Sequence, residues 1–322
     1  MIRVLILRFS SIGDIVLTTP VIRALKLQIP NSEIHYATKR QFSAALNNNP
    51  YIDHLHLLDQ DNGTLVQSLK NYHFDYIIDL HHNLRTWSIG LQLKGKRFTF
   101  RKLNFLKWLL VHFKINFLPK IHVVERYFEA VSSLNVVYDQ QGLDFFTSTE
   151  DQVEVKKNLG DITPGYIALA VGAQHFTKQI PTPKIIRLIA DHPHQKFILL
   201  GGKNDANKAF AIEQASPSNV VNAVNKLSLG ASAVVIKNSS LLIAPDSGLM
   251  HIAAALQKKT ILVWGNTIPD FGMGSFDNKA GVINLEVDQL ACRPCSKLGH
   301  NTCPKKHFNC MNLQEINLSK FD

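Results

Sequence analysis

Short apolar runs alternate along the first half of the chain with longer stretches whose apolar residues recur every three or four positions. The short runs are typical of strands buried on both faces, and they cover residues 3–7, 33–37, 53–57 and 75–80. The longer stretches predict helices at 15–27, 39–46, 62–72, 84–93, 104–113 and 124–134. Strands that alternate with helices form a parallel sheet.

The same pattern restarts after a polar, turn-rich segment at 139–164, which we expect to be an inter-domain linker. Strands are expected at 166–171, 196–200, 220–221, 241–243 and 260–264, and helices at 184–190, 227–236 and 252–256. A length of 322 residues suits two domains of roughly 150 residues each. We therefore predict an α/β protein with two doubly wound parallel-sheet domains, 1–160 and 161–322, that face each other across a cleft.

The stretch 243–256 reads as a strand end, a tight turn and a helix. Asp246 and Ser247 are N-cap residues, and Gly248 lets a ligand approach the backbone. Such a turn directs free N–H groups and the positive end of a helix dipole at one spot, which suits a phosphate or sugar hydroxyls. His251 lies one helical turn further on and is expected to reach the same spot. The alternative is an ordinary capped helix with a core-facing histidine.

Polar loops also follow strands of the first half. The loop from Arg8 to Asp14 lacks both GxGxxG and a P-loop motif, so neither dinucleotide nor ATP binding is indicated. Asp14 is its one acid and is either a general base or a helix cap. His81 and His82 follow the fourth strand and are expected to touch substrate or solvent, because adjacent histidines rarely bind one metal ion.

In the second half, Lys178 is a natural phosphate partner, although a lone lysine in a loop is often only solvated. Neither half shows a nucleophilic serine or cysteine with its base, or the paired acids of a glycoside hydrolase. The residues suggest a phosphorylated donor in the second domain and an anionic acceptor in the first.

The formal charge of +10 is concentrated between Arg85 and Arg126, where ten basic residues stand against Glu125 alone. A basic segment of this kind indicates an anionic partner: a membrane surface, a phosphorylated lipid or nucleic acid. Within it, residues 103–118 combine Leu, Phe and Trp with spaced lysines, as an interfacial amphipathic helix does. The alternative is a core helix with solvated lysines.

No apolar run is long enough to span a membrane, and the N-terminus has no signal-peptide pattern. We therefore expect a cytoplasmic protein, peripheral on the inner membrane if the basic segment binds lipid. The cysteines lie in one Lys- and Pro-rich tail, at Cys292, Cys295, Cys303 and Cys310. They are candidate ligands for a structural zinc ion; free thiols and, least favoured, disulfides are the alternatives.

Two stretches carry a resemblance to a known family: Arg8-Phe-Ser-Ser-Ile-Gly-Asp-Ile-Val-Leu-Thr-Thr-Pro20 and Pro245-Asp-Ser-Gly-Leu-Met-His-Ile-Ala-Ala-Ala255. Both resemble the signatures of glycosyltransferase family 9, the ADP-heptose:lipopolysaccharide heptosyltransferases. The resemblance implies a GT-B fold with two Rossmann-like domains. It also implies inverting transfer of a heptose from ADP-heptose to a lipopolysaccharide inner-core, lipid A-linked acceptor, with no cofactor for catalysis.

The resemblance also assigns roles by position. Asp14 matches the general base. The expected donor-binding residues are Lys178, Asp205, Asp246, Ser247, Gly248 and His251. The family's hydroxyl residues before the lysine are replaced here by Ala173 and Gln174. The expected acceptor-binding residues are Ser11, Gly13, His81, Arg85, Arg97 and Arg101.

The expected partners are an ADP-sugar, an anionic lipid-linked saccharide and the inner-membrane surface, with no nucleic acid. Two alternatives stay open: a transferase or epimerase of another nucleotide sugar on the same fold, and a non-enzymatic basic module that binds RNA or a membrane.

Overall fold

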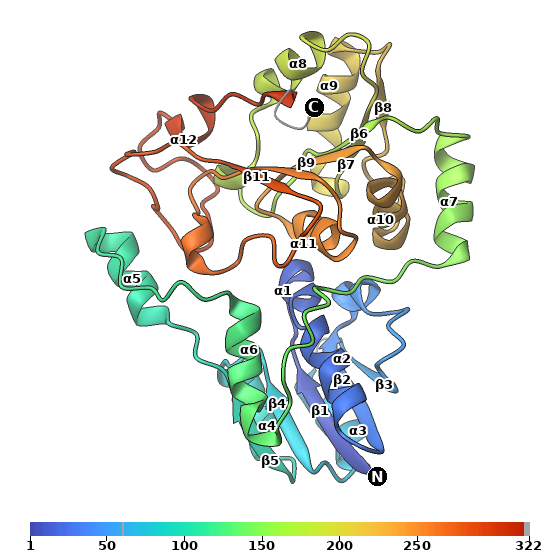
Figure 1. Cartoon of the computed structure of the whole chain (residues 1–322), viewed down its shortest axis with the longest axis vertical. Helices are drawn as coiled ribbons and strands as arrows, with labels where there is room; N and C mark the ends of the chain where they lie inside the picture. The colour runs from blue at the N-terminus through green and yellow to red at the C-terminus, as the bar shows by residue number, and fades with distance from the viewer. Residues whose placement is uncertain (60, 319–322) are drawn as a thin grey trace. The chain divides into compact units, whose positions relative to one another are not determined.

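The computed structural model describes residues 1–59 and 61–318 and divides into two compact units (Figure 1). The first unit contains residues 1–103 and 121–146, and the second contains residues 104–120 and the chain from Thr147 onward. The sequence predicted a single boundary, at residue 160. In the structure the second unit begins at Thr147 and also contains residues 104–120.

The first unit is built on a sheet of five parallel strands in the order β3-β2-β1-β4-β5. The strands are β1 (Ile2–Leu7), β2 (Ser32–Lys39), β3 (His54–Leu58), β4 (Tyr76–Asp79) and β5 (Lys96–Thr99). Its helices are α1 (Ile12–Val16), α2 (Thr19–Gln28), α3 (Asn62–Lys70), α4 (Leu84–Leu91) and α6 (Val123–Val131), with 3-10 turns η1 (Arg40–Ala45) and η2 (Ser132–Leu134). β1 is the central strand, and four of its six residues are buried, as a strand covered on both faces requires.

The helix predicted over 15–27 is two helices. α1 ends at Val16, and α2 begins at Thr19 with Pro20 in its first turn. Proline has no N–H to donate, so it is tolerated in a first turn but not in a helix interior. The short α1 therefore stays close to the end of β1, together with its candidate residue Asp14.

The second unit has six parallel strands in the order β11-β10-β9-β6-β7-β8. The strands are β6 (Ile167–Ala170), β7 (Phe197–Leu200), β8 (Val220–Asn222), β9 (Leu241–Pro245), β10 (Thr260–Val263) and β11 (Val282–Leu285). Its helices are α5 (Asn104–Phe113), α7 (Thr149–Leu159), α8 (Thr182–Ala190), α9 (Ala206–Ala215), α10 (Leu229–Asn238), α11 (Gly248–Ala255) and α12 (Asn309–Asn312), with 3-10 turns η3 (Phe176–Lys178), η4 (Lys203–Asp205) and η5 (Pro269–Phe271). The predicted pair of doubly wound parallel sheets is confirmed.

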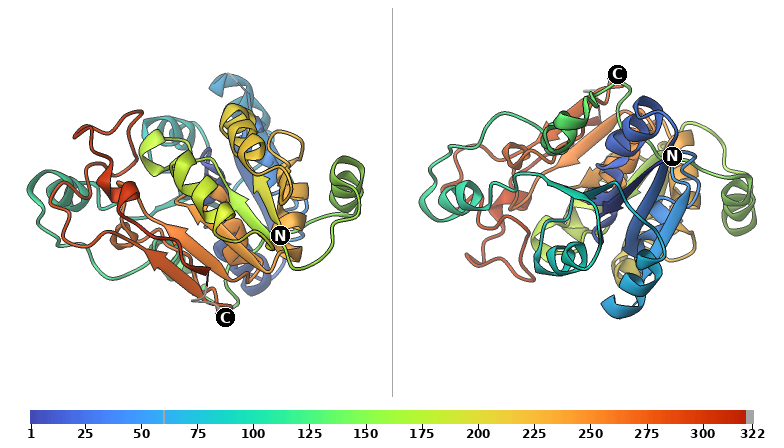
Figure 2. Two further views of the ribbon diagram at one scale, coloured as in Figure 1. Left: turned by 90° about the horizontal axis from the view of Figure 1, so that it is seen from above. Right: turned by 90° about the horizontal axis from the view of Figure 1, so that it is seen from below.

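The segment expected to be a linker contains α7, the green helix at the right edge of both views in Figure 2. Ser148 and Asp151 form a capping box at its start, and Val155 is its one buried residue. α7 packs against α10, and Asn158 donates a hydrogen bond to the carbonyl of Lys226 at 3.0 Å. A helix with so few apolar residues gives little periodic signal, so the sequence pattern missed it.

The strand order reverses at one place in each sheet, and the candidate site residues lie in loops beside these two places. In the first unit the reversal lies between β1 and β4, and in the second it lies between β6 and β9. Loops that leave the carboxyl ends of the two flanking strands diverge at such a point and leave a crevice for a ligand. The loops concerned are the ones that the sequence selected.

Within residues 1–59 and 61–318, no helix combines the length and the apolar character needed to cross a membrane.

Candidate active site

The loop after β1 holds Asp14 in a network of charged hydrogen bonds. Arg8 Nη2 lies 2.5 Å from Asp14 Oδ1, and the backbone N–H and hydroxyl of Ser11 donate to Asp14 Oδ2 at 3.0 and 2.8 Å. Asp14 is also the third residue of α1, so it completes a capping box. The two readings of Asp14, a helix cap and a poised carboxylate, are therefore compatible.

Arg8 connects this loop to the neighbouring strand. Its guanidinium donates to the carbonyls of Ser10 and Leu80 and to the hydroxyl of Tyr127. Burial by itself would lower the pKa of Arg8, but Asp14 and the nearby tyrosines outweigh it and raise that pKa. The Arg8 guanidinium therefore places a positive charge directly beside the Asp14 carboxylate.

A pocket of about 500 Å³ lies where the loops after β1 and β4 diverge. Its lining residues are Phe9, Ser10, Lys39, His81, Asn83, Leu84 and Arg85. His81 and Arg85 belong to the predicted acceptor set. Lys39 was missed, because the sequence placed it at the start of a helix over 39–46, whereas in the structure it ends β2.

His81 is fixed by Asp79, whose carboxylate accepts hydrogen bonds from the backbone N–H groups of His81 and His82 at 3.0 and 2.6 Å. The imidazole lies beside Phe9, and its buried Nδ1 has no hydrogen-bond partner within the described residues. Burial, followed by the charges of Arg8 and Lys102, lowers the pKa of His81 to about 4. His81 is therefore neutral at pH 7 and suited to hydrogen bonding with a sugar hydroxyl.

The other predicted acceptor residues have different surroundings. Ser11 and Gly13 lie at the start of α1, where Gly13 is buried. Arg97 lies within β5 and packs alongside Gly90 of α4 rather than lining the pocket. Arg101 follows β5, and its carbonyl accepts a hydrogen bond from Arg126 at 3.1 Å.

In the second unit, an ion pair spans the reversal point between β6 and β9. Lys178 Nζ lies 2.6 Å from Asp246 Oδ2, and Thr267 Oγ1 donates to the same oxygen at 2.7 Å. Lys178 ends η3 in the loop after β6, Asp246 follows β9, and Thr267 follows β10. Two predicted donor residues therefore meet, and Thr267 joins them without having been predicted.

The amino end of α11 follows Asp246 closely in the chain. Ser247 occupies the N-cap position in an extended conformation, as predicted, but its side chain makes no capping hydrogen bond. Its Oγ is buried and has no hydrogen-bond partner within the described residues. Gly248 begins the helix, and His251 is 3% exposed one turn later. A buried hydroxyl without a partner is costly, so Ser247 is a natural contact for a ligand.

Asp205 packs closely against the loop after β6, at Gly172. Its carboxylate accepts from the backbone N–H of Gly202 at 2.9 Å, and a Cβ at Gly172 would lie 2.0 Å from Asp205 Oδ2. Residue 172 must therefore be glycine for the loop to approach Asp205.

Lys208, which was not among the predicted residues, connects the two ends of the same loop. Its ammonium donates to the carbonyls of Val171 and Ile180 at 2.8 and 2.5 Å. Burial lowers the pKa of Lys208 to about 8, against the opposing charge of Asp205.

The four cysteines are free thiols gathered in the tail of the second unit, and Cys292 Sγ lies 3.8 Å from His307 Nε2. Burial and the neighbouring Cys295 and Cys303 raise the pKa of Cys310 to about 12. Within the described residues, no three of these donors come within 4.8 Å of one another. The structure therefore brings the four cysteines into one segment, but their sulfur atoms are not arranged closely enough to bind one metal ion.

Comparison with known proteins places this geometry in a family. Residues 63–302 match the family model described as glycosyltransferase family 9 (heptosyltransferase). The lipopolysaccharide heptosyltransferase 1 of Campylobacter coli is 28% identical over 290 residues, covering 82% of this chain and 84% of the relative.

Solved structures share the fold at low sequence identity. A family 9 glycosyl transferase from Veillonella parvula superposes with a TM-score of 0.75 at 19% identity, covering 90% of this chain and 88% of that one. The E. coli heptosyltransferase WaaC, solved with ADP, gives a TM-score of 0.69 at 20% identity, with coverages of 88% and 93%. The predicted GT-B fold is thereby confirmed.

Proposed function

Because this chain belongs to glycosyltransferase family 9 and is a glycosyltransferase, we propose that it transfers a heptose from ADP-heptose to a lipid A-linked inner-core acceptor of lipopolysaccharide. The names of its relatives support the acceptor class, since they include lipopolysaccharide and lipooligosaccharide heptosyltransferases. Family membership excludes the alternative of a non-enzymatic RNA- or membrane-binding module.

On the donor side, Lys178 and the amino end of α11 bind the diphosphate. An ammonium and free backbone N–H groups at a helix start both favour phosphate oxygens. Lys178 pairs with Asp246 at 2.6 Å, which positions its ammonium where the loops after β6 and β9 meet. Ser247 Oγ gains its missing hydrogen-bond partner when the donor binds.

On the acceptor side, Asp14 is the general base. Its carboxylate accepts the proton of the acceptor hydroxyl as that oxygen attacks the anomeric carbon, and ADP leaves from the opposite face. Arg8 and Ser11 orient the carboxylate. The carboxylate takes the proton as the new bond develops, when the hydroxyl becomes acidic.

The single observation that carries the donor assignment is the ion pair of Lys178 and Asp246 beside the unpartnered hydroxyl of Ser247. Calorimetric titration with ADP, UDP and GDP, without added metal, tests it. We expect ADP to bind selectively and Asp246→Ala to abolish that binding. Preference for UDP or GDP would keep the reaction class and replace the donor.

The sugar is tested separately. Incubation with ADP-heptose and a heptose-deficient lipopolysaccharide should yield an acceptor heavier by one heptose, read by mass spectrometry. Transfer from ADP-glucose at an equal or higher rate would contradict the heptose assignment while leaving the donor nucleotide intact.

We further propose that the four tail cysteines hold a structural zinc ion, with no part in the reaction. Thiols whose pKa is raised by burial and by each other, as at Cys310, stay protonated until a cation replaces the protons. To bind one zinc ion, the cysteine sulfur atoms must move closer together than they lie in this structure. Elemental analysis of the purified protein for zinc and iron, with Cys292→Ser as the matched variant, tests this site.

We also propose that α5 attaches the protein to the cytoplasmic face of the inner membrane. Only Leu110 of this helix is buried, which contradicts the alternative of a core helix. Phe105, Trp108 and Phe113 are 68%, 46% and 59% exposed. Aromatic side chains flanked by lysines suit the interface of an anionic bilayer.

A further inference from the structure

A cluster of three histidines and one glutamate lies on the edge strand β3 and its neighbour β2, away from the candidate active site. β2 and β3 are parallel neighbours, and His35 on β2 is paired in register with His54 on β3. Alternate residues of a strand share one face, so Glu33 and His35 lie on the same side of the sheet as His54 and His56.

Three ligand atoms converge within this cluster. His54 Nε2 lies 3.0 Å from Glu33 Oε1, and His35 Nε2 lies 3.7 Å from Glu33 Oε2. One ligand atom from each of Glu33, His35 and His54 lies within 4.8 Å of the other two. In the described part of the chain, this is the one group of three or more such residues that meets this closely.

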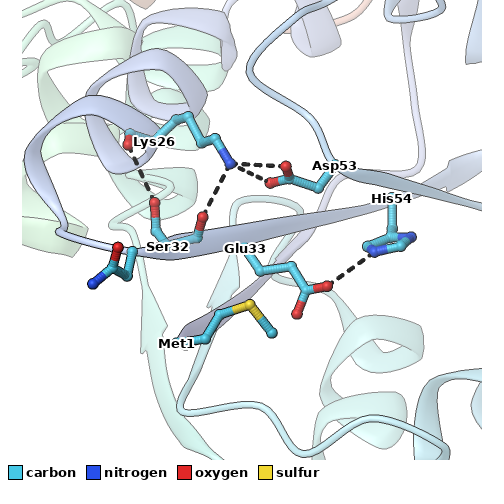
Figure 3. A pocket seen from close by; sticks show the side chains of 7 residues that line it. Met1, Lys26, Ser32, Glu33, Asp53 and His54 are labelled. Atoms are coloured by element: carbon cyan, nitrogen blue, oxygen red, sulfur yellow. Dashed lines mark hydrogen bonds and ion pairs between the residues drawn. The ribbon is translucent and has the colours of Figure 1, made fainter.

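The cluster borders an open hollow of about 640 Å³ (Figure 3). Figure 3 shows the Glu33 carboxylate and the His54 ring turned toward each other, with the side chain of Met1 beside them. An ion from solution therefore has a path to this group.

One nitrogen of the cluster makes no hydrogen bond within the described residues. His35 is 0% exposed, and its Nε2 is buried without a hydrogen-bond partner within the described residues. Its other nitrogen, Nδ1, lies 2.9 Å from His56 Nε2. A histidine held through one nitrogen, with the other directed at a carboxylate and a second imidazole, has the arrangement of a metal ligand with its orienting partner.

Aromatic packing fixes the same ring. The His35 imidazole stacks on those of His54 and His56, at centroid distances of 4.5 and 5.1 Å, and meets the edges of Tyr72 and Phe74. A ring held in this way cannot turn its unpartnered nitrogen toward water, so the cost of leaving that nitrogen buried persists until a ligand arrives.

Two cations already lie nearby, and both are occupied. Arg3 Nε lies 2.6 Å from Glu33 Oε2, and Lys26 Nζ lies 2.7 Å from Asp53. Glu33 Oε1, which hydrogen-bonds to His54 Nε2 at 3.0 Å, is the oxygen that Arg3 does not contact, and a metal ion would bind it in place of that hydrogen bond. The arginine competes for the same carboxylate, so the affinity is moderate rather than extreme.

We propose that Glu33, His35 and His54 bind a divalent transition-metal ion, Zn²⁺ above all, with His56 orienting His35 and water completing the shell. Two imidazoles and one carboxylate are ligands that zinc accepts in tetrahedral geometry. The ion joins β3, which is an edge strand, to β2.

The site is not catalytic. Glu33 is the second residue of β2, and Lys39, at the end of that strand, borders the acceptor pocket. Six residues of strand correspond to about 20 Å, so an ion at Glu33 is far from that pocket.

Zinc titration of the metal-stripped full-length protein tests the proposal, with bound zinc measured by equilibrium dialysis and melting temperature by calorimetry. We compare His54→Gln and Glu33→Gln with His73→Gln, an exposed histidine of the same unit. We expect the unchanged protein and His73→Gln to bind one zinc ion more than either site variant and to melt at a higher temperature when it is bound.

The tail thiols are a second possible zinc site, so the type of ligand must be read as well. Co²⁺ bound to imidazole and carboxylate lacks the thiolate-to-cobalt charge-transfer band that Co²⁺ at cysteines shows. We expect the cobalt equivalent that is lost in His54→Gln to contribute no such band. Equal zinc stoichiometry in all four proteins, each confirmed as folded by circular dichroism, would overturn the proposal.

Discussion

Arg8 links the two halves of the acceptor-side geometry. Its guanidinium binds Asp14 in the loop after β1 and the carbonyl of Leu80 in the loop after β4. A single buried arginine can do this because its planar fork presents several donors in fixed directions. The position of Asp14 therefore depends on the neighbouring strand as well as on its own helix.

Replacing Asp14 with asparagine should remove the base and leave the donor site intact. We expect kcat to fall by roughly 10²- to 10⁴-fold, the usual contribution of a positioned base, while the ADP affinity changes by less than about twofold. Steady-state transfer rates and calorimetry measure the two effects. Asp59→Asn, at an exposed aspartate paired with Arg40, is the matched control. An equal loss of ADP affinity would remove Asp14 from the role of base.

Lys178→Met should weaken ADP binding, because it removes a charged donor and leaves Asp246 without its ion pair. Loss of a hydrogen bond to a charged group costs about 1.5–3 kcal/mol, which corresponds to a rise in Kd of roughly 10- to 150-fold. Lys203→Met, at an exposed lysine of η4, should change little. An unchanged Kd in Lys178→Met would place Lys178 outside the donor site.

His81 makes stability depend on pH in a defined direction. Its pKa is about 4 in the folded chain and roughly 6.5 when unfolded, so the unfolded chain binds more protons between these values. The free energy of unfolding should therefore fall as the pH falls from about 6.5 to 4, and more gently in His81→Asn. Urea denaturation across this range measures it. Equal slopes in both proteins, with an imidazole NMR titration midpoint near 6.5, would contradict the assignment.

At the scale of elements, the apolar runs predicted the strands of both sheets that are covered on both faces. The exceptions are informative. β5 (Lys96–Thr99) has charged, exposed residues at the edge of its sheet, and β11 is only partly buried at the edge of the other. An edge strand buries less apolar surface, so its sequence carries less of the signal on which such predictions rest.

Site residues could be predicted where the local sequence of one loop identifies them. Residues that act through a contact between loops distant in the sequence could not be predicted. Asp14 lies in the first turn of α1, and Asp246 and Ser247 lie in the turn between β9 and α11; the local sequence identifies all three. Thr267 and Lys208 act by reaching a neighbouring loop, at Asp246 and at the ends of 171–180 respectively. That contact depends on the strand order, which the apolar pattern does not specify.

α5 provides the prediction that belongs to this scale. Replacing Phe105 and Phe113 with serine should weaken binding to anionic vesicles at least tenfold, since a fully buried phenylalanine contributes about 1.5–3 kcal/mol. Cosedimentation measures this binding. Serine at Val153 and Phe210, both exposed on other helices of the second unit, is the matched control. Equal binding by both double variants would exclude α5 as the membrane contact.

At the scale of the whole molecule, the chain passes between the two units three times, after residues 103, 120 and 146. The segment 104–120 is held within the second unit by its own contacts. Lys114 Nζ donates to the carbonyl of Pro294 at 2.6 Å, and Asn116 donates to Asp270 at 2.8 Å. The basic segment found in the sequence is therefore divided between the units.

This connectivity predicts that cutting the chain at residue 146 will not release two free halves. The amino-terminal fragment retains segment 104–120, whose packing partners are in the carboxyl-terminal fragment. With a protease site inserted there, we expect the cleaved protein to elute from a sizing column as one species. Lys114→Ala combined with Asn116→Ala removes the contacts to Pro294 and Asp270 and should cause the fragments to separate more readily. Full separation of the unsubstituted fragments at once would show that segment 104–120 contributes nothing to holding them together.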